Sequence, residues 1–294
     1  MTTDNNCSTH PVTIDVEPES SNTTNENQQS KKSASSTQVQ LLNLAKNFGL
    51  ADSLKPENKQ LPIEERMLKR DRYTHLRKQS NMEAIIEKSI KYCSEHVASS
   101  KADPDWFSNF IELAENISNN VMQDLWAKIL AGEISNPGSF SLKTLRTFKN
   151  LAIHDAKLLA KACAVAVKDK SKRNIRLLSG SYQKPGLFNL LNKQRAVDFK
   201  LSEFGLGYGE ILALSDNNLL YAQETELAPM AKGDEIALRQ GGSPIILRAK
   251  KNGIVLRFYK FTVVGVELAQ LIGDKPDEEL LTALKIKLSH HFDS

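Results

Sequence analysis

The stretch LWAKILAGEISNPGSFSLKTL, from Leu125 to Leu145, decides the helical part of the fold, because it contains two helix segments and the corner between them. Its first half is apolar at helical spacing, and Asn136-Pro137-Gly138 then predicts a chain reversal. Ser139 or Ser141 can cap the helix that follows. Glu133 stands at the end of the apolar helix, where its carboxylate can accept amide hydrogens from the next helix start. We therefore interpret Glu133 as a structural residue, not a catalytic one.

The segment before this corner predicts two more helices. In Asp103-Pro104-Asp105-Trp106, the first aspartate can act as N-cap and the proline suits the first helical position. Ser118 can cap the helix that carries Trp126. Because Trp106 and Trp126 lie on the apolar faces of adjacent amphipathic helices, we expect both indoles in the core and not in a ligand platform.

One long helix is expected further upstream, from Ile63 to Val97. Its first half is mostly charged, and either projects into solvent or packs on another copy of the chain. Its second half carries one apolar stripe at spacings of three and four residues, made of Met82, Ile86, Ile90, Cys93 and Val97.

Composition divides the chain into four parts. Residues 1–38 are rich in Ser, Thr, Asn and Gln and are expected to be disordered. Residues 39–167 predict an α-helical domain, which ends with helices over 141–151 and 156–167. Residues 168–195 contain several loop signals and predict a basic linker. Residues 196–294 alternate short helices and strands and predict a small α+β domain.

A β-hairpin over residues 245–261 is the clearest strand signal, with a turn at Asn252-Gly253. This register would pair Arg248 with Arg257, which is mildly unfavourable unless an anion or an acidic side chain lies over them. Lys250 would lie on the same basic face. An exposed basic face that protects a sheet edge is the alternative interpretation.

The run Phe261 to Leu268 is similar to the ending that follows the wing of winged-helix modules. The resemblance covers eight residues and implies a winged-helix-like domain. The expected fold is therefore mainly α with an α+β C-terminal part: a helical bundle followed by a small winged-helix-like domain with a basic β-hairpin.

Positive charge gathers in the expected linker. Residues 168–195 contain eight basic side chains and one acidic side chain, with Tyr182 and Phe188 among them. Such a segment can bind nucleic acid, and is otherwise a solvated linker. With the hairpin it gives the candidate polyanion-binding residues Lys172, Arg173, Arg176, Arg248, Lys250, Lys251 and Arg257.

Several classes of function find no support in the sequence. It has no apolar run of membrane-spanning length, no secretory leader, no metal-ligand spacing and no motif of a nucleotide-binding or hydrolytic enzyme. The three cysteines are far apart, and Cys163 is expected to be buried. We expect a non-enzymatic cytoplasmic protein without cofactor, metal or membrane partner.

The central motif resembles a bacterial family known only as a domain of unknown function. The similarity is strongest over residues 60–165 and includes Asn81 and the runs Met122 to Ile134 and Pro137 to Ser141. Its structural marker residues are Asp103, Trp106, Trp126, Glu133, Pro137, Gly138, Ser139 and Ser141. The resemblance implies no activity and no catalytic residues, and some members are similar to prophage- or defence-associated proteins.

Two functions remain as hypotheses. The first is a non-enzymatic protein that binds nucleic acid, an acidic protein surface or another polyanion through residues 168–195 and the hairpin. The second is a protein-interaction scaffold that forms a homo-oligomer through the long helix 63–97.

Overall fold

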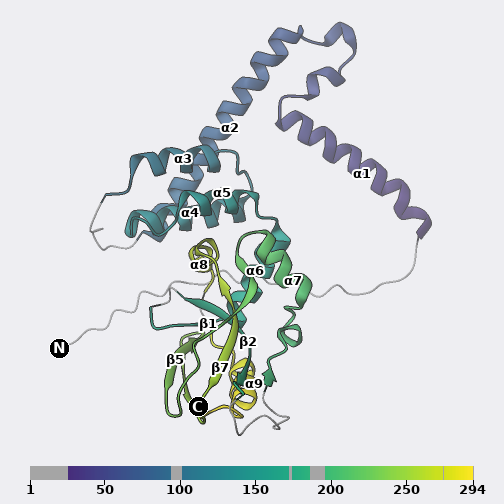
Figure 1. Cartoon of the computed structure of the whole chain (residues 1–294). Coiled ribbons are helices and arrows are strands. Elements are labelled where there is room, and N and C mark those ends of the chain that lie inside the picture. The colour runs from purple at the N-terminus through teal and green to yellow at the C-terminus, as the bar shows by residue number, and fades with distance from the viewer. Residues whose placement is uncertain (1–25, 94–100, 172–173, 186–195, 274, 294) are drawn as a thin grey trace, which may run out of the picture. The chain divides into compact units, whose positions relative to one another are not determined.

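The computed structural model describes residues 26–93, 101–171, 174–185, 196–273 and 275–293, with side chains from residue 37 onward (Figure 1). The chain divides into two compact units. Unit 1 consists of Met1–Cys93 and Ile111–Ala131, and unit 2 consists of Ser94–Phe110 and Gly132–Ser294.

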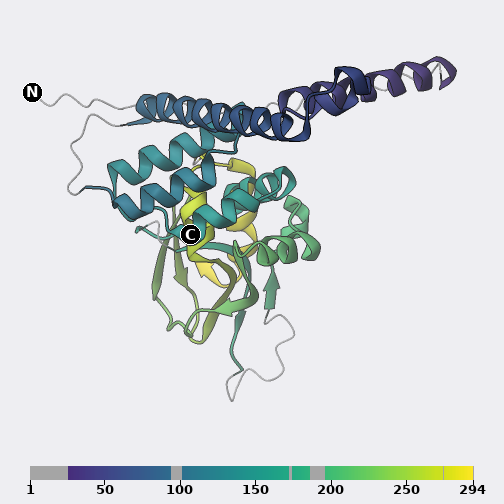
Figure 2. The same cartoon turned by 90° about the horizontal axis from the view of Figure 1, so that it is seen from above.

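The helices follow the expected order. The long helix begins at Ile63 as predicted but ends at Tyr92, because Cys93 is extended, and not at Val97 (Figure 2, in blue). Their bounds are α1 (Glu26–Asn47), η1 (Ala51–Leu54), η2 (Glu57–Lys59), α2 (Ile63–Tyr92), α3 (Pro104–Ala114), α4 (Asn120–Ser135), α5 (Leu142–Asn150), α6 (Ile153–Val165), η3 (Leu201–Phe204), α7 (Tyr208–Asp216), α8 (Val263–Ala269) and α9 (Glu278–Leu288). Helix α1 begins inside the segment 1–38 that composition predicts to be disordered, and residues 1–25 lie outside the described residues.

The corner between α4 and α5 has the predicted structure. Glu133 is buried, and its two carboxylate oxygens accept the backbone amides of Gly138 and Phe140 at 2.7 and 2.9 Å. Ser141 caps α5 by accepting the amide of Thr144. The buried indole of Trp106 donates to the carbonyl of Phe140 at 2.6 Å. The role predicted for Glu133 is therefore confirmed: it closes the corner.

The cap predicted for α4 is wrong by one residue. Asn119 accepts the amide of Met122, whereas the Ser118 hydroxyl accepts from the Asn81 side chain at 3.1 Å. Asn81 also receives a hydrogen bond from Gln123, so these buried amides connect α2 with the start of α4 inside unit 1. Serine and asparagine cap helices equally well, so local sequence does not choose between adjacent candidates.

The strands of unit 2 form an eight-stranded antiparallel sheet in the order β4-β7-β2-β1-β5-β6-β8, with β3 paired to β2 (Figure 1). Their bounds are β1 (Val167–Lys168), β2 (Ile175–Gln183), β3 (Ala196–Asp198), β4 (Leu220–Glu226), β5 (Glu235–Gln240), β6 (Ser243–Ala249), β7 (Ile254–Phe261) and β8 (Phe292–Asp293). The chain thus combines helices with an antiparallel sheet.

The predicted hairpin over 245–261 is wrong in its pairing, although both strands exist. Strand β6 pairs with β5 and β8, and β7 pairs with β2 and β4. The hairpin that does form joins β5 to β6 through Gly241-Gly242, both at positive φ, which suits a tight two-residue turn. Strand β7 pairs with β2 and β4, which are distant in sequence, and not with β6 across Asn252-Gly253. This pairing gives β7 a neighbour on each side within the sheet.

The segment 168–195 is part of the sheet and not only a linker. Its residues Ile175–Gln183 form β2, which pairs with β1, β3 and β7. Most side chains of β2 are buried. Arg176 is the only basic residue of β2, so the positive charge of the segment lies mostly outside the strand. The predicted domain boundary therefore does not coincide with the division into two units.

Candidate functional site

Arg257 on β7 does not lie on a free basic face. Its guanidinium makes ion pairs with Asp198 and Glu224, and only 21% of the side chain is exposed. Burial disfavours its charge, but the hydrogen bond to Asp198 and the nearby Glu224 outweigh this and raise the pKa of Arg257 above its usual value. Gly180 provides the space, because a Cβ there would lie 2.7 Å from the guanidinium.

Arg248 and Lys250 also have acidic or carbonyl partners. Arg248 lies opposite Glu235 in the β5–β6 register and makes an ion pair with it. Lys250 donates to the carbonyl of Ser289 at 2.5 Å and lies 3.4 Å from the carboxylate of Asp293. Arg248 and Arg257 therefore each face an acidic side chain of the protein, and no external anion is needed to offset their charge.

Among the described residues, the predicted polyanion-binding residues of the segment 168–195 add no exposed cation to this part of the sheet. Lys172 and Arg173 lie outside the described residues. Arg176 is on β2 with its guanidinium 5.1 Å from the centre of the Phe258 ring, and burial lowers its pKa. The predicted polyanion-binding residues therefore do not form one surface in the part of the chain that the structure describes.

A different group of lysines comes together at the turn Lys250–Gly253. The Asn252 side chain accepts the amide of Lys232 at 2.7 Å, and the carbonyl of Gly253 accepts the amide of Lys184 at 2.8 Å. Lys184, Lys232 and Lys251 are exposed, and none makes an ion pair with a described residue. We call these three residues the turn lysines. Lys251 was one of the predicted polyanion-binding residues and Lys184 lies in the predicted basic segment 168–195, whereas Lys232 was not predicted, because it lies far from both along the chain.

Ser181 and His291 form a hydrogen-bonded pair of a hydroxyl and an imidazole inside unit 2. The serine hydroxyl lies 2.8 Å from Nδ1 of His291, and both residues are buried. Burial first, then the nearby His290 and Lys251, lower the pKa of His291 to about 4. Because the serine is fully buried, its hydroxyl cannot reach a substrate, and we assign the pair a structural role.

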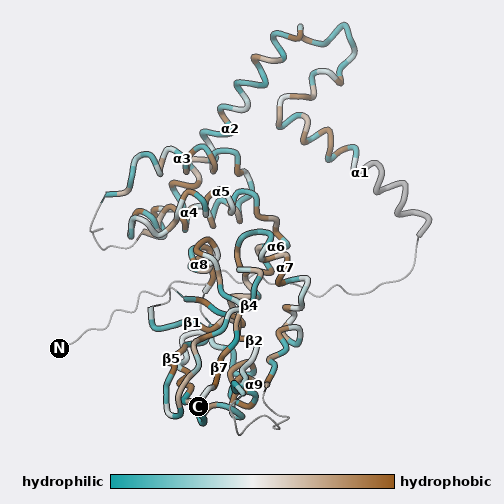
Figure 3. Tube along the Cα trace, viewed as in Figure 1, coloured by the Kyte–Doolittle hydropathy of each residue, from teal (hydrophilic) through white to brown (hydrophobic). Residues whose placement is uncertain are grey.

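Unit 1 presents the largest set of exposed apolar side chains. We call residues 37–92 the arm; it comprises the described side chains of α1, the loop after it and α2. More than half of the large apolar side chains that are exposed in the described chain belong to it. Figure 3 shows hydrophobic positions, in brown, recurring along α1 and α2. Those from the first part of the arm are Val39, Leu41, Leu42, Leu44, Phe48, Leu50, Leu54, Ile63, Met67, Leu68, Tyr73 and Leu76.

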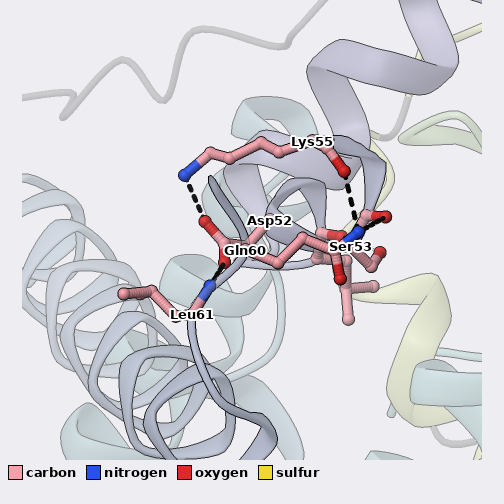
Figure 4. A network of polar contacts seen from close by, with 6 residues as sticks. Asp52, Ser53, Lys55, Gln60 and Leu61 are labelled. Atoms are coloured by element: carbon pink, nitrogen blue, oxygen red, sulfur yellow. Dashed lines mark hydrogen bonds and ion pairs between the residues drawn. The ribbon is translucent and has the colours of Figure 1, made fainter. Parts of the chain in front are cut away.

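The loop between α1 and α2 is held by its own polar contacts. The buried carboxylate of Asp52 accepts from the Lys55 ammonium and from the amide of Leu61, and these bonds lower the pKa of Asp52 (Figure 4). Gln60 donates to the carbonyls of Lys55 and Ser53 at 2.7 and 3.2 Å. The arm is thus a defined helix–loop–helix element.

The apolar stripe predicted on α2 is only partly buried. The buried face consists of Asn81, Met82, Ile85 and Ser89. Ile86 and Ile90, two members of the predicted stripe, are 41% and 69% exposed. Cys93 is exposed and Val97 lies outside the described residues. Helix α2 therefore has a second apolar face that points away from its own unit's core.

The described residues contain neither a metal-binding cluster nor a membrane-spanning helix. Within the described ranges, no three metal-binding side chains come close enough to hold an ion together. None of the helices found there has both the length and the apolar character that crossing a membrane requires.

Comparison with known proteins gives one match. The family model described as "Protein of unknown function (DUF2806)" matches residues 65–285, from the start of α2 into α9. No curated protein and no solved structure matches the chain.

Proposed function

Because the chain belongs to the DUF2806 family, whose description names no activity, we propose its function from the structure: the protein self-associates, and the arm is the interface. The observation that carries this proposal is the concentration of exposed apolar side chains on α1 and α2. Large contiguous apolar surface on a soluble protein commonly marks an interaction site, because leaving it in water costs free energy.

The internal contacts of the arm also support an interface. Phe48 at the end of α1 lies 4.1 Å under the guanidinium of Arg77, and a Cβ on Gly49 would touch Arg70. Together with the Asp52 network, these contacts fix the apolar residues on a preformed element. A preformed surface loses less conformational entropy on binding than a flexible one.

Self-association is tested by sedimentation equilibrium of the full chain from about 1 to 100 µM, a range that resolves micromolar dissociation constants. We expect a dimer or larger assembly for the wild-type chain. Replacing four exposed arm residues together (Leu41→Asp, Leu44→Asp, Leu68→Asp and Leu76→Asp) should give a monomer of unchanged circular dichroism. The matched control is Ile153→Asp with Ile286→Asp, two equally exposed apolar residues outside the arm. A wild-type monomer over the whole range would refute the proposal.

We propose polyanion binding as a second function, carried by the turn lysines. Three exposed lysines from separate segments lie around one turn and make no ion pair with a described residue, so their ammonium groups can face a phosphate backbone. A winged-helix mode is not part of this proposal, because β6 and β7 would have to pair as a wing and they pair with other strands.

Polyanion binding is tested by measuring retention on DNA and RNA over a salt series, with nuclease treatment as a control. The slope of log affinity against log salt is negative. Lys184→Glu, Lys232→Glu and Lys251→Glu should each make it shallower by about 1, as expected for one lost phosphate contact. Arg248→Gln should change the slope less, since that guanidinium already faces Glu235. Equal retention of all four variants and the wild-type chain would exclude the turn lysines.

A further inference from the structure

The outer face of α2 carries a continuous stripe with coiled-coil spacing. All of its positions are exposed, and they follow one another at intervals of four, four, three, four, three and four residues. They are Leu68, Arg72, Leu76, Gln79, Glu83, Ile86 and Ile90. The four apolar members are between 41% and 69% exposed, so the stripe has two apolar ends and a polar centre.

Charge on this stripe changes sign along the helix. Lys69 and Arg72 lie near its first end, and Glu83 and Glu87 lie in its second half. Lys91 lies 3.4 Å from Glu87, but both side chains are mostly exposed, so this weak pair costs little free energy to exchange for another partner. Two stripes in parallel would place Arg72 against Arg72 and Glu83 against Glu83. Two antiparallel stripes instead bring Lys69 and Arg72 of each copy nearer to Glu83 and Glu87 of the partner subunit.

The shape of the stripe is also self-complementary. Lys69, Arg72, Tyr73 and Leu76 line a half-open hollow in its basic half. Exposed isoleucines, Ile86 and Ile90, project from the other half. One two-fold axis can place the isoleucines of each copy in the hollow of the other, which is the closed arrangement that most homodimers use.

We infer that two copies of the chain pair through these outer stripes of α2 in antiparallel orientation; this inference rests on the proposed self-association and names its interface. The register places Leu76 opposite Ile86 of the partner subunit and Gln79 opposite Glu83 of the partner subunit. Arg72 then lies within one helical turn of Glu87 of the partner subunit.

Helix α1 does not occupy the stripe in the structure. Its described contacts with α2 run through Phe48 and Gly49 to Arg70, Tyr73 and Arg77, none of which is a member of the stripe, although Tyr73 also borders the hollow. The apolar ends of the stripe therefore stay exposed within one copy. A second copy can cover them with its own apolar side chains and can supply partners for the charged ones.

Orientation is tested by cross-linking single-cysteine variants of the full chain. Cys7→Ser and Cys93→Ser remove the other thiols, except for the buried Cys163. With a short bismaleimide, a mixture of Leu76→Cys and Ile86→Cys chains should give a cross-linked dimer. Leu76→Cys alone should give little, because its two thiols would lie about 15 Å apart along the helices. Strong cross-linking of Leu76→Cys to itself would refute the antiparallel pairing.

A second measurement separates this inference from the proposed function. Leu76→Asp with Ile86→Asp should raise the dissociation constant at least 100-fold, while Ile153→Asp with Ile286→Asp should leave it unchanged. If the stripe variant remains dimeric and Leu41→Asp with Leu44→Asp does not, the arm associates through α1 and the α2 pairing is wrong. If the wild-type chain is monomeric, both proposals fail.

Discussion

Gly265→Ala is expected to lower the free energy of unfolding by about 3 kcal/mol or more, because it forces a side chain against backbone. Gly265 lies in the first turn of α8, where its amide donates to the Thr262 hydroxyl at 3.0 Å. A Cβ there would lie 2.1 Å from the carbonyl oxygen of Leu219, which no rotamer change can relieve. The same hydroxyl donates to the carbonyl of Asn218 at 2.6 Å, so the helix cannot simply move away.

Urea denaturation of the full chain measures this effect, with Gly209→Ala as the matched control. Gly209 is also helical, in α7, but nothing lies within 4 Å of a Cβ built there. That substitution should be neutral or stabilise by up to about 1 kcal/mol, since alanine favours the helix. Wild-type stability of Gly265→Ala would show that α8 does not approach the Leu219 carbonyl as closely as the structure has it.

Stability is expected to fall by about 3 kcal/mol between pH 7 and pH 4 on account of His291 alone. In the folded chain the pKa of His291 is about 4, below its ordinary value of 6.5. Between these values the unfolded chain binds a proton that the folded chain does not, so acid favours unfolding. The stability that depends on neutral His291 is fully present above about pH 6.5 and is lost as the pH falls towards 4.

Denaturation curves at several pH values test this, with His291→Asn and His154→Gln for comparison. Asparagine can keep a hydrogen bond to Ser181 but does not titrate, so its stability should depend less on pH. His154 is exposed, and its replacement should leave the dependence in place. If His291→Asn does not fold, NMR titration of the wild-type imidazoles decides: a His291 ring that protonates near pH 6.5 would contradict the prediction.

The run Phe261 to Leu268 is accounted for by these contacts. It had suggested a wing ending, but in the structure Thr262 caps α8 and Gly265 permits its close approach. Glu267 accepts from the amide and the hydroxyl of Ser141 at 2.7 and 3.0 Å, and so connects α8 to the start of α5. A motif with an evident structural role needs no nucleic-acid function to explain it.

Sequence alone determined the elements whose signals are local. The corner after α4 was predictable because Glu133, the Pro-Gly turn and Ser141 act within a few residues of one another. The burial of Trp106, Trp126 and Cys163 followed from helical spacing and residue type. The family resemblance rested on the same dense stretch, and the family match over residues 65–285 confirms it.

Only the tertiary structure decided which segments pair and which faces are covered. Strand β7 could pair across Asn252-Gly253 or with β2, and only the completed sheet favours the second arrangement. Lys184 and Lys232 meet at one turn for the same reason, and Arg248 and Arg257 face acids that no local pattern could assign. On α2, Ile85 and Ile86 are equally apolar neighbours, but one is buried and the other is exposed. Residue type sets how much free energy burial can release, whereas contacts distant in sequence set which side chain is buried.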